Sequence, residues 1–259
     1  MAYSYDDLMK DIDRGQLRPV YFFYGPEEFR KEQAVQALIG KLVPRELRDF
    51  NLDILYGDET DAGQILDRIS TLPMMAERRV VLIRDVAALS PSSKKQLPVH
   101  LKTAFAHACL IMTAGQIDVR KAFYRDLRRV AQEFIFGLLK RQEIPDWICE
   151  RAREYGKSID PQAIQMLWDG FQSNLVALDN EISKLAIYTA ERDQIRSEDV
   201  SAVVGELRAH TVFEFCDAIC FRDLPKAMIL LSCLMEAGIT PFNIIWQLRE
   251  HLKNLVSIG

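Results

Sequence analysis

The residues that follow the first apolar run have types that a phosphate-binding loop uses: Gly25-Pro26-Glu27-Glu28-Phe29-Arg30-Lys31-Glu32. Such a loop reads G-x-x-x-x-G-K-[ST], because backbone N–H groups approach the phosphates, the lysine neutralises them and the hydroxyl binds magnesium. Gly25 and Lys31 stand at the required positions. Arg30 replaces the second glycine, and Glu32 replaces the hydroxyl residue.

These replacements oppose nucleotide binding for physical reasons. A large side chain at Arg30 obstructs the approach of phosphates to the backbone, and the glutamates of the loop place negative charge where a triphosphate would lie. Asp85 follows an apolar run but has no second acidic residue beside it to bind magnesium and water. We interpret Lys31 as an ordinary solvated helix residue, and we predict a degenerate loop that binds no nucleotide, so no cofactor is expected.

Outside this loop, no set of residues has the spacing of a catalytic or metal site. The five cysteines contain no C-x-x-C pair, and Cys216 and Cys220 lie one helical turn apart without a matching pair of cysteines or histidines. The four histidines have no nearby partners at nucleophile or metal spacing, and G-x-S-x-G is absent. We therefore predict a chain with no catalytic site of its own and no metal.

Composition excludes several classes of protein. The chain has 259 residues and a formal net charge of −4, which argues against strong nucleic-acid binding through overall charge. No apolar run reaches the length that crosses a membrane, and the acidic, amphipathic N-terminus is not a signal peptide. An odd number of cysteines without pairing motifs fits reduced thiols. These features predict a cytoplasmic protein without membrane contact.

The turn Leu72-Pro73-Met74-Met75 is unusually apolar. Pro73 cannot continue a helix, so the chain must turn there, and a turn at the edge of a sheet is normally polar because it faces water. In one interpretation Leu72, Met74 and Met75 fold back into the core, as apolar side chains usually do. In the other they form an apolar plug for a pocket on another protein, a use for which flexible methionine is well suited.

A basic segment has two interpretations as well. Its five cationic residues crowd one predicted helix against a single acidic residue, Asp126. The helix face is either merely solvated or contacts a DNA backbone or an acidic partner, in which case binding would be salt-sensitive. The residues are Arg120, Lys121, Arg125, Arg128 and Arg129.

The elements that must position these residues alternate between strands and helices in the first half of the chain. Strands are expected at 19–24, 51–56, 79–83, 109–113 and 134–138, and helices at 4–14, 27–43, 64–71, around 97–105 and 123–130. The aromatic run at 19–24 is typical of a strand buried on both faces. This alternation predicts a five-stranded parallel α/β sheet over residues 1–140.

After residue 140 we expect only helices. Residues 141–209 form a small all-helical domain, with helix starts at Pro145 and at Asp160-Pro161. Residues 210–259 form apolar helices that end abruptly and look like an incomplete bundle, which leaves apolar surface for other subunits. The predicted fold class is thus α/β followed by all-α.

Taken together, these motifs resemble the delta subunit of bacterial DNA polymerase III, the subunit of the clamp loader that grips the sliding clamp. The resemblance covers the whole chain, with a C-terminal truncation. Its most specific part is STLPMMAERRVVLIRD, supported by PVYFFYGPEEFRKEQAV, CLIMTAGQIDVRKAFYRDLRR and NLVALDNEISKLAIYTAERDQIRSEDVSAVV.

The resemblance implies a fold, a site and partners. The fold is AAA+-like with a degenerate phosphate loop over 1–140, a helical lid domain over 141–209 and the start of a helical collar over 210–259. The apolar pair of the family maps onto Met74 and Met75, with Leu72 as a third contact and methionine where an aromatic residue is frequent. The implied partners are the sliding clamp (beta subunit), other clamp-loader subunits through the collar, and primer-template DNA within the complex.

The implied function is that of a non-catalytic subunit that holds the clamp interface open during chromosomal replication. Two alternatives stay open at this point. One is a divergent AAA+ ATPase, which Arg30 and Glu32 oppose. The other is a stator-type clamp-loader subunit, but the zinc-binding cysteine cluster and the Ser-Arg-Cys motif of that subunit are not in this sequence.

Overall fold

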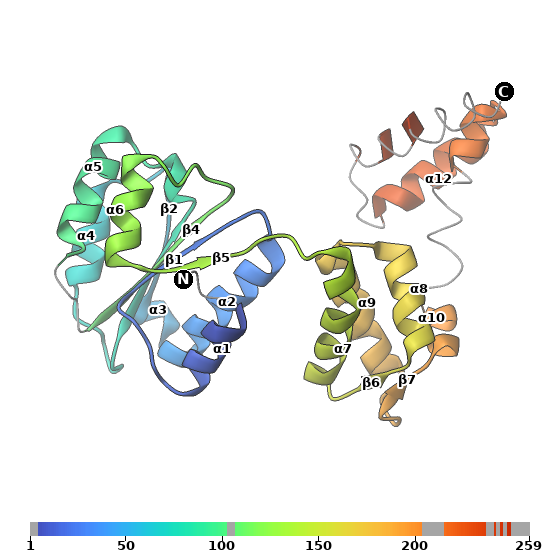
Figure 1. Cartoon of the computed structure of the whole chain (residues 1–259), viewed down its shortest axis with the longest axis horizontal. Coiled ribbons are helices and arrows are strands. Elements are labelled where there is room, and N and C mark those ends of the chain that lie inside the picture. Colours follow the sequence, from blue (N-terminus) through green and yellow to red (C-terminus); the bar gives the residue numbers. More distant parts are fainter. Residues whose placement is uncertain are drawn as a thin grey trace. The chain divides into compact units, whose positions relative to one another are not determined.

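A computed structural model describes residues 5–102, 107–203 and 215–236, together with residues 241, 244, 245, 248 and 249. The chain divides into two compact units, Met1–Leu138 and Leu139–Gly259, which are described separately (Figure 1). The expected boundary between residues 209 and 210 lies outside the described residues, so the division of the second half into lid and collar stays a prediction.

The first unit is built on the five-stranded parallel sheet that the sequence predicts. The strand order is β2-β3-β4-β1-β5, and all neighbouring pairs are parallel. Four strands lie close to their predicted bounds. The fifth begins and ends earlier than the predicted 134–138, because an edge strand accommodates polar residues such as Gln132 and Glu133. The strands are β1 (Val20–Tyr24), β2 (Leu52–Tyr56), β3 (Arg79–Arg84), β4 (Ala108–Ala114) and β5 (Gln132–Ile135).

Helices cover both faces of this sheet (Figure 1). A hydrophobic core lies on each face of the sheet, and alternate side chains of the buried strand β1 point into one core or the other. Phe22 packs in the core beneath α4, α5 and α6, and Phe23 packs in the core beneath α1 and α2. The helices of this unit are α1 (Tyr5–Asp13), α2 (Glu28–Leu42), α3 (Arg48–Asn51), α4 (Ala62–Ser70), α5 (Pro91–His100) and α6 (Ala122–Val130).

Helix α5 begins earlier than its apolar spacing predicts. Ser90 caps it by accepting a hydrogen bond from the backbone N–H of Ser93, and Pro91 occupies the first helical position. Leu101 follows the helix, and Phe105 lies outside the described residues. The cap and the proline therefore fix the start of the helix, which apolar spacing alone places too late.

The second unit is mainly helical but contains two short strands that the sequence analysis missed. β6 (Ser158–Ile159) and β7 (Gln194–Ile195) pair in parallel, and two residues are too few to form a recognisable apolar run. Asp160 caps α8 through a 2.7 Å bond from the Ala163 N–H and also accepts the Ser197 N–H. The helices are α7 (Ile144–Glu154), α8 (Pro161–Phe171), α9 (Leu175–Tyr188), α10 (Ser197–Val203) and α12 (Leu224–Glu236).

Within the described ranges, no helix has both the length and the apolar content that crossing a membrane requires.

Candidate functional site

The loop that follows α4 is positioned by the helix before it. A reciprocal capping box fixes the start of α4, with bonds of 2.9 Å from the Gln64 N–H to Asp61 and 3.1 Å from the Asp61 N–H to Gln64. Ile65 and Ile69 are fully buried against the sheet. The helix ends at Ser70, and Pro73 prevents it from continuing. The chain therefore enters the loop at a fixed place.

The three apolar side chains of this loop face solvent. The exposed fractions are 71% for Leu72, 54% for Met74 and 84% for Met75. These side chains are therefore not folded back into the core. Single exposed apolar residues are common on protein surfaces and need no explanation. Three of them close together on one loop form an apolar patch, which is typical of an interaction site.

Asn51 holds the loop by its main chain. Its side chain is fully buried and donates from Nδ2 to the carbonyl oxygen of Met74 at 2.8 Å, while the Met74 N–H donates to Asn51 Oδ1 at 2.7 Å. Nδ2 also donates to the Leu47 carbonyl at 3.0 Å. An amide that satisfies both main-chain groups of Met74 fixes the backbone there and leaves the side chain directed outward.

Met75 adopts a backbone conformation that disfavours its side chain. Its φ is +56°, in the left-handed region where glycine and asparagine are the usual residues. A non-glycine residue in this region costs about 1–3 kcal/mol. A long apolar side chain is thus held in a strained conformation and still left exposed to water, and the stability of the fold gains nothing from either feature.

The other end of the loop is anchored by a buried arginine. Arg79, the first residue of β3, donates from Nε to Asp53 Oδ2 at 2.7 Å and from Nη1 to the Phe50 carbonyl at 2.9 Å. The Phe50 side chain is itself about half exposed, next in sequence to Asn51. Both ends of the loop are therefore attached to the segment that leads into β2.

Lys31 is not the solvated residue that the sequence analysis predicts. It is buried, and its Nζ donates to the carbonyl oxygens of Gly25 at 3.0 Å and Ala114 at 2.8 Å, with Glu28 at 2.7 Å. The prediction is wrong because the Ala114 carbonyl, at the end of β4, is 83 residues away in sequence, and the sequence does not show that the fold brings it next to Lys31 and Gly25. The ammonium group that would contact phosphate in an active loop is committed to the protein itself.

The negative charges of the loop are committed as well. Glu32 forms a two-bond ion pair with Arg84, which lowers the pKa of the Glu32 carboxyl below its ordinary value. Glu27 caps α2 by accepting the Phe29 N–H at 3.1 Å, and burial raises the pKa of Glu27. Arg30 lies over the ring of Tyr5, with the guanidinium carbon 4.9 Å from the ring centre.

Gly25 serves packing and does not cradle a phosphate. Its φ is +133°, and a Cβ atom there would lie 2.2 Å from the carbonyl oxygen of Phe136. The backbone N–H of Glu27 donates to the same oxygen at 3.0 Å, and the Gly25 N–H donates to Gly115. The loop is packed directly against the segment that follows β5, where a side chain could not fit.

The basic segment is more neutralised than its sequence indicates. Arg120 and Lys121 precede α6, with Lys121 at the N-cap position. Arg120 pairs with Asp118, Arg128 with Glu133, and Arg129 with Asp126. Asp126 is the single acidic residue of the helix, as the sequence indicates, but Asp118 before the helix and Glu133 of β5 also pair with arginines of the set. In the described part of the chain, Lys121 and Arg125 are the two members of the set without an ion pair.

Sequence reasoning did not single out Asn51, Arg79 or the backbone of Met75. The only signal for Asn51 was a polar residue directly before an apolar strand, and Arg79 read as the charged boundary of a strand. Neither position reveals a partner across the fold without the structure.

The first unit is a five-stranded parallel α/β domain with an exposed apolar loop, and the second unit is mainly helical. Residues 21–127 match the family model described as DNA polymerase III, delta subunit. Within these residues the chain is similar to DNA polymerase III delta subunits.

Three comparisons extend the match beyond that range. The chain is 24% identical to the Bacillus subtilis DNA polymerase III subunit delta, over 92% of this chain and 72% of that protein. It is 20% identical to the Escherichia coli DNA polymerase III subunit delta, over 98% and 74%. The solved Bacillus subtilis DNA clamp loader delta protein has the same fold, with a TM-score of 0.68 and 23% identity over 96% of this chain and 76% of that one.

Proposed function

We propose that this chain is a clamp-loader subunit that binds the sliding clamp through Leu72, Met74 and Met75 and holds the clamp interface open for loading onto primed DNA. The observation that carries the proposal is the exposed apolar loop, fixed by Asn51 and strained at Met75. Stability alone favours polar residues and a glycine in such a turn, so a partner is the reason for these side chains.

Burial of the three side chains supplies the driving force. Apolar surface removed from water contributes about 25 cal/mol per Å², so the loop can contribute a few kcal/mol to binding. The anchored backbone reduces the entropy that is lost when the loop binds. Opening follows only if the site binds the open clamp more tightly than the closed clamp, because a ligand shifts an equilibrium solely through differential affinity.

We propose further that the chain has no catalytic site of its own and needs no nucleotide. The support is that Lys31 and Glu32, the residues at the phosphate and magnesium positions, are engaged by carbonyl oxygens and by Arg84. Motor subunits would then supply the ATP-driven step.

The proposed partners also include other loader subunits and DNA. Residues 210–259 are proposed to contact other loader subunits in a cytoplasmic complex. Lys121 and Arg125 are proposed to approach the backbone of primer-template DNA in that complex.

The opening role is tested by release of clamp rings. Closed cognate clamps are placed on nicked circular DNA, and this chain is added in excess without ATP. We expect release to accelerate at least tenfold, and a Met74→Ala plus Met75→Ala variant not to accelerate it. Normal binding of the clamp without faster release would show that the chain binds but does not open it. Dependence of release on added ATP would favour a divergent ATPase.

A further inference from the structure

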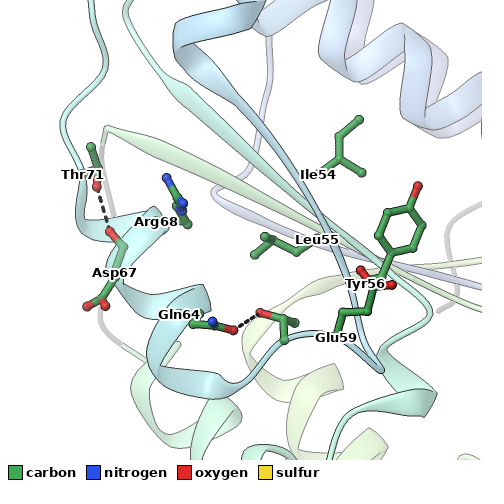
Figure 2. A pocket seen from close by; sticks show the side chains of 9 residues that line it. Ile54, Leu55, Tyr56, Glu59, Gln64, Asp67, Arg68 and Thr71 are labelled. Atoms are coloured by element: carbon green, nitrogen blue, oxygen red, sulfur yellow. Dashed lines mark hydrogen bonds between the residues drawn. The ribbon is translucent and has the colours of Figure 1, made fainter.

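A groove of about 390 Å³ lies between β2 and α4 (Figure 2). Its lining includes Thr71, the residue directly before the apolar loop. Its walls are Ile54, Leu55 and Tyr56 from the strand and Gln64 and Arg68 from the helix, among others. β2 is the last strand on this side of the sheet, and no strand pairs with its outer edge in the described part of the chain. An open strand edge is a template for pairing with another chain.

The register shows which main-chain groups face the open edge. The N–H and C=O groups of a strand residue point to the same side, and the side alternates along the strand. Gly57 donates its N–H to the Arg84 carbonyl of β3, so Leu55 and Asp53 also face β3. Ile54 and Tyr56 therefore turn their backbone N–H groups toward the open edge.

The side chains at these two positions are apolar and exposed. Ile54 is 47% exposed and Tyr56 is 52% exposed. Edge strands that avoid pairing carry charged residues or proline, and neither Ile54 nor Tyr56 is of that kind. The edge thus combines free main-chain groups with apolar side chains, as strand-accepting sites do.

Arg68 adds a positive charge to the wall of the groove. Its side chain is 56% exposed and lies 3.6 Å from Asp53, whose other carboxylate oxygen already pairs with Arg79 at 2.7 Å. Glu59 lies beside Tyr56, near the opposite end of the strand, and the Asp67 carboxylate points away from β2 (Figure 2). The guanidinium of Arg68 is therefore able to receive a carboxylate from a bound segment.

The groove is continuous with the apolar loop. Asn51, which is bonded to Met74, directly precedes β2, and Arg79 ties Phe50 and Asp53 to the end of the loop. A protein whose pocket receives Met74 and Met75 is consequently brought alongside the edge of β2. We propose that an extended segment of the sliding clamp adds to this edge as a further strand, with a carboxylate facing Arg68. This inference rests on the proposed function and names a second contact of the same partner.

The test is amide hydrogen exchange of this chain, measured residue by residue with and without saturating cognate clamp. We expect exchange at Ile54 and Tyr56 to slow at least tenfold in the complex, while Asp53 and Leu55, already bonded to β3, change little. Arg68→Glu should weaken clamp binding at least fivefold and make the clamp affinity less dependent on salt concentration. The control is Arg45→Glu, because Arg45 is an exposed arginine on a different segment, and this variant should bind the clamp like the wild type.

The outcomes separate the two proposals. If the clamp binds through Met74 and Met75 but exchange at Ile54 is unchanged, the edge contact is wrong and the proposed function stands. If the wild-type chain does not bind the clamp at all, both fail. If Ile54 is protected without clamp and the protection grows with the concentration of this chain, a second copy occupies the edge and the assignment to the clamp is overturned.

Discussion

Asn51 and Met74 are separated by 23 residues and exchange two hydrogen bonds, of 2.8 Å and 2.7 Å. One buried amide thereby satisfies both main-chain groups of a residue whose side chain lies in solvent. The arrangement orders the loop before any partner arrives. A loop that is already ordered loses less entropy on binding than a mobile one.

Asn51→Ala is expected to weaken clamp binding although Asn51 itself is buried and cannot touch the clamp. Loss of the amide leaves main-chain groups of Met74 and Leu47 without partners, which we expect to reduce the free energy of unfolding by about 1–3 kcal/mol. Chemical denaturation and clamp titration measure the two effects. The control is Leu185→Ala in α9, which should destabilise the second unit without changing clamp affinity; equal loss of affinity in both variants would argue against a positioning role.

Met75→Gly and Met75→Ala separate backbone strain from side-chain function. Both remove the apolar side chain, so both should weaken clamp binding to a similar extent. Only glycine relieves the left-handed backbone at φ +56°, so the glycine variant should be the more stable of the two by about 1 kcal/mol. Thermal unfolding gives the stabilities. A glycine variant less stable than the alanine variant would show that the backbone there is not strained.

Lys31→Met tests whether the lysine at the phosphate position has become structural. We expect a loss of about 1–3 kcal/mol in the free energy of unfolding, because the carbonyl oxygens of Gly25 and Ala114 lose a buried charged donor. Lys41→Met, on the exposed side of the same helix, should stay within about 0.5 kcal/mol of the wild type. A neutral Lys31→Met variant, or tight ATP binding by the wild type in calorimetry, would restore the nucleotide-binding interpretation.

The ion pair of Glu32 with Arg84 predicts an acid-dependent stability. Because the pKa of Glu32 is lowered in the folded state from its ordinary value of 4.5, its ionised form stabilises the fold. That contribution is fully present above about pH 4.5 and is lost as the pH falls through the lowered pKa. Glu32→Gln should therefore lower the urea midpoint at pH 7 and lower it less at pH 3. Glu46→Gln, an exposed residue in no described ion pair, should show no such difference.

The sequence predicted those features that depend on neighbours along the chain. The buried run around Phe22 and Phe23, the break at Pro73 and the alternation of strands with helices each follow from local chemistry. Features that depend on distant residues were missed. Lys31 reads as solvated because nothing near it in sequence shows the Ala114 carbonyl, and Arg128 reads as free because Glu133 belongs to the following strand. The exposure of Met74 and Met75 was one of two open interpretations until their surroundings were known.

The central claim is that the apolar side chains of the loop enter a pocket on the sliding clamp. The most direct measurement is the dissociation constant of the cognate clamp for the wild type and for Met74→Ala plus Met75→Ala. The matched control is Met228→Ala plus Met235→Ala, because these methionines are 55% and 53% exposed on α12. We predict that the loop variant binds at least tenfold more weakly, which corresponds to about 1.4 kcal/mol, and that it keeps the wild-type unfolding midpoint. Unchanged affinity in a folded loop variant would contradict the account.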